Sequence, residues 1–219
     1  RFLHFIHKMK LNQLRWLYLI ALSIIWGSSF ILMKYALVGL SAVQVGALRV
    51  FITAVFLILI GFKRLFKIEK RHWYYLVLNG FIGSFIPSFL MAYTVEKMDS
   101  SIVSILNSLT PLNTLLFGAL LFGFGFRKRQ LAGVLIGLLG TLMLILKGAE
   151  LNPNQDYFYS SFILVASICY ALNANILKKY LYELDALSIT VANFVVLIIP
   201  TILVLLFSGF FTDFEVNES

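Results

Sequence analysis

The chain has 219 residues, of which 60% are hydrophobic and 13% are charged, and its mean hydropathy is +0.91. A soluble domain has an apolar share of about 45–50%, so this composition excludes an ordinary water-soluble fold and indicates a protein whose solvent is lipid. The formal net charge is +8, and the single cysteine, Cys169, excludes an internal disulfide and a cysteine-based metal cluster.

Seven apolar runs are long enough to cross a bilayer as helices. A helix needs about 20 apolar residues to span the hydrocarbon core, and these runs are roughly twice the length of a barrel strand. They also show no alternation of apolar and polar residues. We therefore predict an all-α, polytopic bundle of membrane helices. The predicted spans are residues 14–37, 42–62, 73–94, 101–122, 129–147, 158–179 and 187–208.

The first span carries a lysine near its outer end. Lys34 shares a helical face with Ser23 and Gly27, and Trp26 lies beside that face. Two interpretations of Lys34 stay open. Its stem lies along lipid while the ammonium reaches the interface, or it faces a solute cavity. On the second interpretation, Trp26 and Lys34 are candidate solute-binding residues.

The second span carries an arginine about two turns from its start. Arg49 shares a helical face with the small residues Gly46 and Thr53, and no predicted span contains a carboxylate. A guanidinium at this depth costs about 3 kcal/mol on insertion scales, so it normally faces a cavity or a partner. Arg49 is therefore either a clamp on backbone carbonyls or a binding residue for an anionic group of a solute.

Prolines and polar side chains mark the third and fourth spans. Pro111 cannot donate to the carbonyl of Asn107, which predicts a kink and a freed carbonyl beside an amide and the Thr110 hydroxyl. This polar stripe either binds solute or simply bonds one helix to another. The candidate binding residues here are Tyr93, Asn107 and Thr110, and the candidate kinks are Pro87 and Pro111.

Each of the last three spans has a distinguishing feature. The fifth carries Gly133, Gly137 and Gly140, a seam of small residues that we expect to pack closely on another helix. In the sixth span, Tyr170 and Asn173 are candidate solute-binding residues. In the seventh, Pro200 is a third candidate kink.

The charges of the connecting segments predict the orientation of the spans. With the N-terminus inside, fourteen basic residues lie on the inner side and only Lys97 and Lys147 on the outer side, while seven acidic residues lie outside and three inside. Cytoplasmic loops characteristically carry such an excess, so the basic balance needs no nucleic-acid partner. The fourteen are Arg1, Lys8, Lys10, Arg15, Lys63, Arg64, Lys67, Lys70, Arg71, Arg127, Lys128, Arg129, Lys178 and Lys179.

The chain contains an internal repeat. A shift of 144 residues sets residues 22–50 over residues 166–194 without a gap, so that Lys34 meets Lys178 and Arg49 meets Asn193. Five spans lie within this offset, and an odd number reverses the direction of the second copy through the membrane. Inverted repeats around a midplane site are typical of secondary transporters. Three further spans would complete the second copy.

Several short motifs carry a resemblance to a known family. The pattern WGSSF…K…R in the first two spans, SLTPL in the fourth and RQLAGVLIGLLGTLML in the fifth resemble the drug/metabolite transporter superfamily, EamA type. The resemblance implies two inverted five-helix repeats, the second incomplete. One departure is LLFGF, where Phe124 stands in place of the family's usual glutamate. The implied domains are a cytoplasmic segment (1–13), a first repeat (14–150) and the start of a second (158–219).

The function expected from these features is secondary transport of small metabolites, amino-acid-like or anionic, by alternating access. We expect an integral protein of a bacterial inner membrane, with a small-molecule solute and lipid as partners, no cofactor, no metal and no nucleic acid, and we leave a homodimer open. Two alternatives also stay open. One is a truncated remnant that does not transport, and the other is a membrane-embedded enzyme, which is disfavoured because no catalytic constellation is visible in the sequence.

Overall fold

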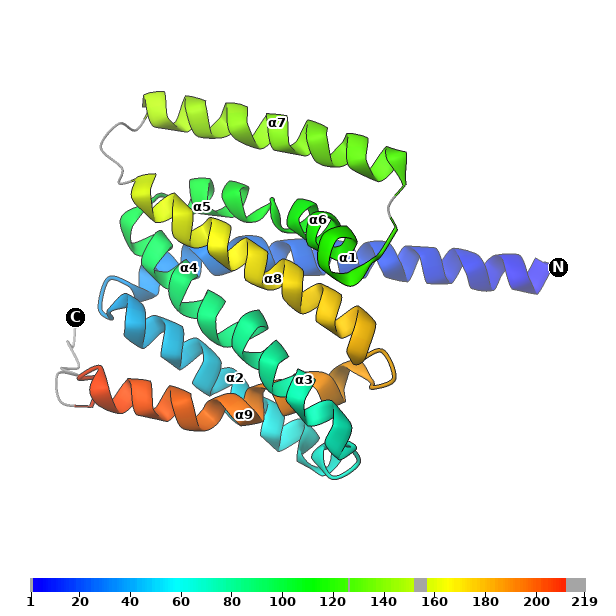
Figure 1. Ribbon diagram of the computed structural model, residues 1–219, viewed down its shortest axis with the longest axis horizontal. Helices are drawn as coiled ribbons and strands as arrows, with labels where there is room; N and C mark the ends of the chain where they lie inside the picture. The colour runs from blue at the N-terminus through cyan, green and yellow to red at the C-terminus, as the bar shows by residue number, and fades with distance from the viewer. Residues whose placement is uncertain (1, 126, 152–156, 212–219) are drawn as a thin grey trace.

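The computed structural model describes residues 2–125, 127–151 and 157–211, and those ranges contain helices and no strand. The helices run broadly along one direction and turn back at two ends of a bundle (Figure 1). The all-α prediction is therefore confirmed. The elements are α1 (Phe2–Ala36), α2 (Ala42–Leu65), α3 (Lys70–Gly80), η1 (Phe81–Phe85), α4 (Ile86–Lys97), α5 (Ser100–Asn107), α6 (Thr110–Phe122), α7 (Lys128–Leu151), η2 (Tyr157–Tyr159), α8 (Ser160–Tyr180) and α9 (Ala186–Phe207).

Most of the predicted spans form helices that are long and apolar enough to cross a membrane. Within the described residues, six helical stretches are long and apolar enough to cross a bilayer, and each coincides with a predicted span. The fifth predicted span, 129–147, lies within the 24-residue helix α7. The six stretches are Trp16–Ala36, Ala42–Leu65, Lys70–Lys97, Ser100–Phe122, Ser160–Tyr180 and Ala186–Phe207.

Two spans are irregular beside a proline. The third passes through a π turn, η1, in which the N–H of Ile86 bonds to the carbonyl of Phe81. Pro87 follows at once, and because proline has no N–H the regular ladder must give way near it. The fourth span is interrupted between α5 and α6, just before Pro111. By contrast, α9 continues through Pro200 without a break.

Helices α2 and α9 pack side by side and run antiparallel (Figure 1). At the start of α2, Gln44 Nε2 donates to the carbonyl of Ser208, 3.1 Å away, just after α9 ends. At the end of α2, Arg64 Nη1 lies 2.8 Å from Asp185 Oδ1, just before α9 begins. These two helices are the second elements of the two predicted repeats, and an inverted repeat requires opposite directions.

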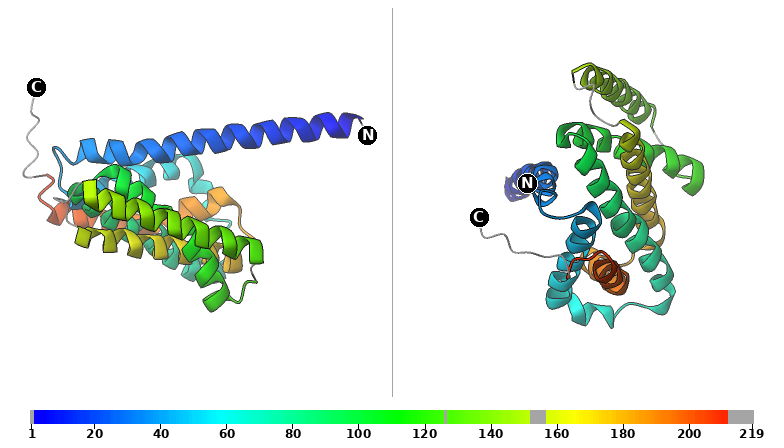
Figure 2. Two further views of the ribbon diagram at one scale, coloured as in Figure 1. Left: turned by 90° about the horizontal axis from the view of Figure 1, so that it is seen from above. Right: turned by 90° about the vertical axis from the view of Figure 1, so that its left-hand side faces the viewer.

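The core lies where α1, α2, α4, α5 and α8 meet, around buried residues such as Met33, Val45 and Met91. Only the C-terminal half of α1 joins it, and the helix extends well beyond the bundle toward the N-terminus (Figure 2). The predicted segment 1–13 is thus continuous with the first membrane helix from residue 2.

Helix α7 packs against α5 and α6 but stands apart from the other helices (Figure 2). A Cβ added at Gly133, Gly137 or Gly140 would meet no neighbouring atom within 4 Å. The expected close packing of this seam is therefore not seen among the described residues.

Candidate functional site

A small polar cavity lies in the membrane part of the bundle, between four spans. Its volume is about 160 Å³. It lies between α2, η1, α4, α8 and α9, so its lining residues come from both predicted repeats. The lining residues are Arg49, Val50 and Thr53 from α2, Gly83 and Ser84 from η1, Ser88 from α4, Tyr170 from α8 and Phe194 from α9.

Arg49 is the only ionisable group among these lining residues apart from Tyr170. Its guanidinium is exposed in the described bundle, and Nη1 lies 3.8 Å from Met33 Sδ. A sulfur atom is a weak acceptor and leaves most of the five N–H donors unused. A charge at this depth cannot remain against hydrocarbon, so the cavity must offer it water or an anion.

Three of the four hydroxyl groups that line the cavity already donate to other atoms. Ser88 Oγ donates to the carbonyl of Gly46 at 3.0 Å, and Thr53 Oγ1 donates to the carbonyl of Arg49 at 2.7 Å. The Tyr170 hydroxyl lies 3.0 Å from Met91 Sδ and donates to it. The oxygen lone pairs of these groups stay available, but most of the unused donors in the cavity belong to Arg49.

The π turn packs closely against the side chain of Asn173 on α8. Gly83 lines the cavity, and the side-chain amide of Asn173 lies directly against it, where any Cβ would collide with that amide. Asn173 Oδ1 is buried and has no hydrogen-bond partner within the described ranges. Glycine is required here by this close approach.

Asn193, the predicted counterpart of Arg49, lies in a different environment. Its side chain is 7% exposed, and with its amide oriented to satisfy both ends, Nδ2 donates to the carbonyl of Leu76 at 3.0 Å. Its oxygen accepts from Asn79 Nδ2 at 2.7 Å. A Cβ at Gly80 would lie 2.9 Å from the Asn193 carbonyl oxygen. This position is therefore a closed contact between α3 and α9.

The ammonium group of Lys34 is hydrogen-bonded to backbone carbonyls. Its ammonium donates to Val95 O at 2.8 Å, Glu96 O at 3.3 Å and Met98 O at 3.4 Å. The last turn of a helix leaves carbonyls without partners and carries partial negative charge, both of which a lysine compensates. In this arrangement Lys34 holds the end of α4 and does not line the cavity.

The remaining sequence-predicted residues also lie elsewhere. Trp26 is 68% exposed on the outside of the bundle. Tyr93 packs against the hydrophobic core, with its ring centroid 6.4 Å from that of Phe162. The carbonyl of Asn107, expected to be free, accepts from Thr110 Oγ1 at 2.8 Å.

The structure thus brings together Arg49 and Tyr170, with Asn173 alongside. Sequence reasoning did not assign Ser84, Ser88 or Phe194 to the site. The run Gly83-Ser84 followed by Pro87-Ser88 was the available signal for the two serines, since small polar residues beside a helix irregularity often line a binding cleft.

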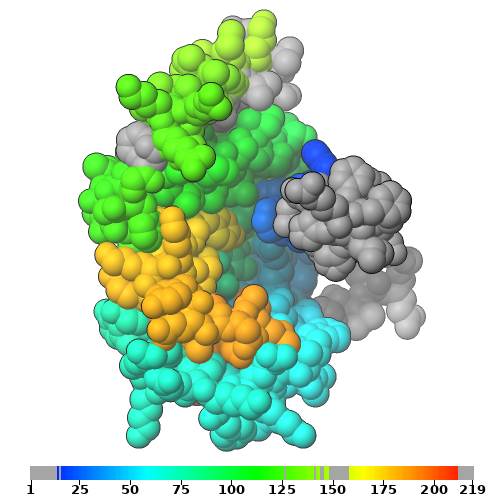
Figure 3. All heavy atoms as spheres, turned by 90° about the vertical axis from the view of Figure 1, so that its right-hand side faces the viewer, coloured from blue at the N-terminus to red at the C-terminus, as the bar shows by residue number. Residues whose placement is uncertain are grey.

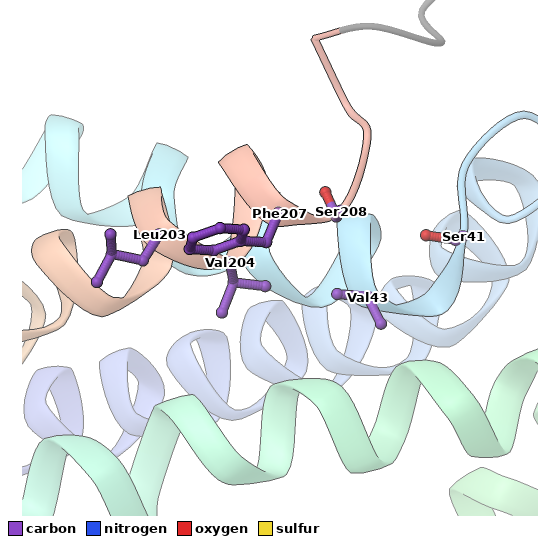
Figure 4. A pocket seen from close by; sticks show the side chains of 6 residues that line it. All are labelled: Ser41, Val43, Leu203, Val204, Phe207 and Ser208. Atoms are coloured by element: carbon purple, nitrogen blue, oxygen red, sulfur yellow. The ribbon is translucent and has the colours of Figure 1, made fainter.

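A larger hollow of about 400 Å³ lies where α2 begins and α9 ends (Figure 4). Its walls include Leu203 and Phe207, which is 87% exposed, and its lining residues carry no charge. The Ser41 hydroxyl caps α2 and the Ser208 hydroxyl donates to Leu205 O. A hollow of this kind suits lipid chains, so we do not assign the solute to it despite its size.

The end of the bundle where α2 finishes and α9 begins is tied by ion pairs. Figure 3 looks onto this end, where residues near 65 (cyan) lie against residues near 185 (orange). Besides pairing with Arg64, Asp185 caps α9 by accepting from the Ser188 hydroxyl at 2.6 Å and its N–H at 3.1 Å. The hydrogen bonds from Ser188 hold the pKa of the Asp185 carboxyl below its ordinary value.

A second group of charges joins the same two loops. Arg71 Nη2 lies 2.7 Å from Glu183 Oε2, and the buried His72 places Nε2 3.4 Å from the same oxygen. All three acidic residues predicted for the inner side, Glu69, Glu183 and Asp185, make ion pairs here. The loops after α2 and after α8 are therefore held together.

No group of three His, Cys, Asp or Glu side chains in the described ranges is placed to hold a metal ion. Comparison with known proteins gives one result. A sequence model of the EamA-like transporter family matches residues 14–146, which is more than half of the chain. No curated protein and no solved structure matches.

Proposed function

Because the chain belongs to the EamA-like transporter family, we propose that it is a secondary transporter that binds a small anionic or amino-acid-like solute in the cavity at Arg49. The observation that carries this proposal is the guanidinium itself. It lies inside a membrane span, lines a cavity between both predicted repeats and has no carboxylate among the lining residues. A solute carboxylate would supply the missing charge and use the planar pair of N–H donors.

The packing of the bundle supports alternating access as the mechanism. Helices α2 and α9 belong to different predicted repeats and both contribute to the cavity, so a rocking motion between repeats would change its exposure. The ion pairs Arg64–Asp185 and Arg71–Glu183 join the two repeats at one end of the bundle. A rocking motion that opens this end would require these contacts to separate.

The orientation that we propose for the bundle in the membrane is based on the distribution of basic residues between its two ends. The end that carries Arg64 and Arg71 faces the cytoplasm, as does the N-terminus, and the membrane is a bacterial inner membrane. In this orientation the ion pairs lie on the cytoplasmic side. Replacing Asp185 and Glu183 would therefore favour a conformation that is open toward the cytoplasm.

Uptake into proteoliposomes tests the proposal. Purified protein is reconstituted, and radiolabelled amino acids, hydroxy acids and other small carboxylates are supplied, with protein-free liposomes as the background. We expect saturable uptake of at least one carboxylate, reduced about 30-fold by Arg49→Gln, since loss of one partner of a buried charge pair costs about 2 kcal/mol or more. Lys97→Gln, at an exposed helix end, is the matched control and should transport normally. Uptake unchanged in Arg49→Gln, or no uptake above background for any solute, would contradict the proposal.

A further inference from the structure

The cavity contains one fixed positive charge and no fixed negative charge. Arg49 is the sole Lys, Arg, Asp or Glu among its lining residues. The other cation of the membrane interior, Lys34, is bound to three carbonyls at the end of α4. In the sequence, all ten acidic residues fall outside the predicted spans. The charge to be balanced by a bound solute is therefore a single positive one.

A zwitterion cannot balance that charge. When the carboxylate of an amino acid pairs with Arg49, its ammonium lies close by within the same small cavity, and the total charge of the site remains positive. The ammonium also has three donors and needs acceptors. The hydroxyl oxygens that line the cavity are neutral acceptors, and a neutral oxygen does not offset an added positive charge within a membrane span.

A monocarboxylate without an ammonium group balances the charge fully. Its carboxylate accepts from Arg49, and its remaining atoms meet apolar walls formed by Val50, Phe194 and the ring of Tyr170. The volume of about 160 Å³ corresponds to roughly five water molecules at about 30 Å³ each, which suits a solute of six to eight non-hydrogen atoms, on the order of a short branched-chain acid.

We propose that this cavity selects small monocarboxylates that carry no ammonium group over the zwitterionic amino acids of the same carbon skeleton. The proposal rests on the proposed transport function and narrows its solute class. A hydroxyl at the α-carbon is compatible with it, because the hydroxyl oxygens of Thr53, Ser84 and Ser88, which line the cavity, can accept from it without introducing a charge.

A matched pair of ligands tests this selectivity without any mutation. Valine and 2-hydroxy-3-methylbutanoate share a carbon skeleton, have eight non-hydrogen atoms each, and differ only in ammonium against hydroxyl at the α-carbon. Isothermal titration of the purified protein at neutral pH should show the hydroxy acid binding at least about 30-fold more tightly than valine, because an uncompensated charge within a membrane span is strongly unfavourable. Arg49→Gln should lose binding of the hydroxy acid, whereas Arg49→Lys, which keeps the charge, should retain the preference.

Equal or tighter binding of valine would overturn the inference, as would the absence of binding by both acids. Neither result removes the proposed function if proteoliposomes still take up another solute in a manner that depends on Arg49. Failure of all uptake would remove the function itself, so the two failures are distinguishable.

Discussion

Arg49 and Asn193 occupy corresponding positions of the predicted repeat, yet their surroundings differ in every respect that matters for binding. Arg49 is exposed and lines a cavity, and its Nη1 lies 3.8 Å from the sulfur of Met33, a weak acceptor. Asn193 is buried and exchanges hydrogen bonds with Asn79 and the carbonyl of Leu76. The charge of Arg49 has no counter-ion among the residues that line its cavity, whereas the buried amide of Asn193 has its hydrogen-bond partners.

The difference shows that corresponding positions of a repeated fold can have different roles, one in binding and one in stability. A buried polar group that has its partners stabilises a helix contact, whereas one that lacks partners is available to a ligand. A site for an asymmetric solute needs only one half to supply the charge. Substitutions at the two positions should therefore have opposite signatures, with binding affected at Arg49 and stability affected at Asn193.

The largest stability effect is expected for Asn193→Leu. This change leaves the amide of Asn79, which is 2% exposed, without its partner on α9. An unsatisfied buried polar group costs about 2 kcal/mol, and thermal unfolding in detergent should show that loss. Affinity for the carboxylate should be unchanged in the protein that remains folded. A variant as stable as the wild type would remove the structural role assigned to Asn193.

A second substitution probes the same closed contact from the other helix. In Gly80→Ala the new Cβ would lie 2.9 Å from the carbonyl oxygen of Asn193, a backbone atom that cannot turn aside. Overpacking of this kind costs about 1–3 kcal/mol, so the melting temperature should fall. Gly133→Ala, whose new Cβ would meet no atom of the described residues within 4 Å, serves as the matched control and should not melt below the wild type.

Lys34→Met should show that Lys34 and Arg49, the two cations within the predicted spans, have different roles. The change removes the donor to the carbonyls of Val95, Glu96 and Met98, and we expect a loss of about 1 kcal/mol in unfolding free energy. Carboxylate affinity should stay within twofold of the wild type, in contrast to Arg49→Gln. A large loss of affinity with no loss of stability would instead place Lys34 in the solute site.

The smallest effect is expected at the ion-paired end, from Asp185. Its carboxyl has a lower pKa in the folded protein than its ordinary value of 3.8, chiefly because Ser188 donates to it. A carboxyl with a lowered pKa stabilises the fold at pH values above its unfolded pKa, and the stabilisation is lost as the pH falls through the folded pKa. The melting temperature of the wild type should therefore fall below about pH 3.8 by more than that of Asp185→Asn. Identical pH profiles would show that the cap contributes nothing.

Much of the fold was predictable because hydropathy and proline chemistry act locally. The span boundaries follow from runs of apolar residues, and the irregularities fall beside Pro87 and Pro111. The contacts between helices were harder to predict from the sequence. The glycine seam of α7 predicts a close neighbour, yet the described residues place none there, since seam composition does not say which helix lies opposite.

The candidate site was predictable only in part for the same reason. Arg49 stood out because a charge within a span always demands an explanation. The three carbonyls that hold Lys34 lie more than 60 residues along the chain, and only tertiary structure brings them near. Ser88 and Phe194 are ordinary residues of apolar helices, and only the packing of α4 and α9 against α2 places them beside the guanidinium.

The most direct test asks whether the cavity at Arg49 contains water and attracts anions. In a Cys169→Ala background, Thr53→Cys places a thiol in the cavity and Leu59→Cys places one on the exposed face of the same helix, where Leu59 is 77% exposed. We predict that a negatively charged, water-soluble thiol reagent modifies Thr53→Cys, that 2-hydroxy-3-methylbutanoate protects it, and that adding Arg49→Gln slows the reaction. Leu59→Cys should react only with a lipid-soluble maleimide. If Thr53→Cys behaves like Leu59→Cys, the guanidinium does not face an aqueous cavity and the account is contradicted.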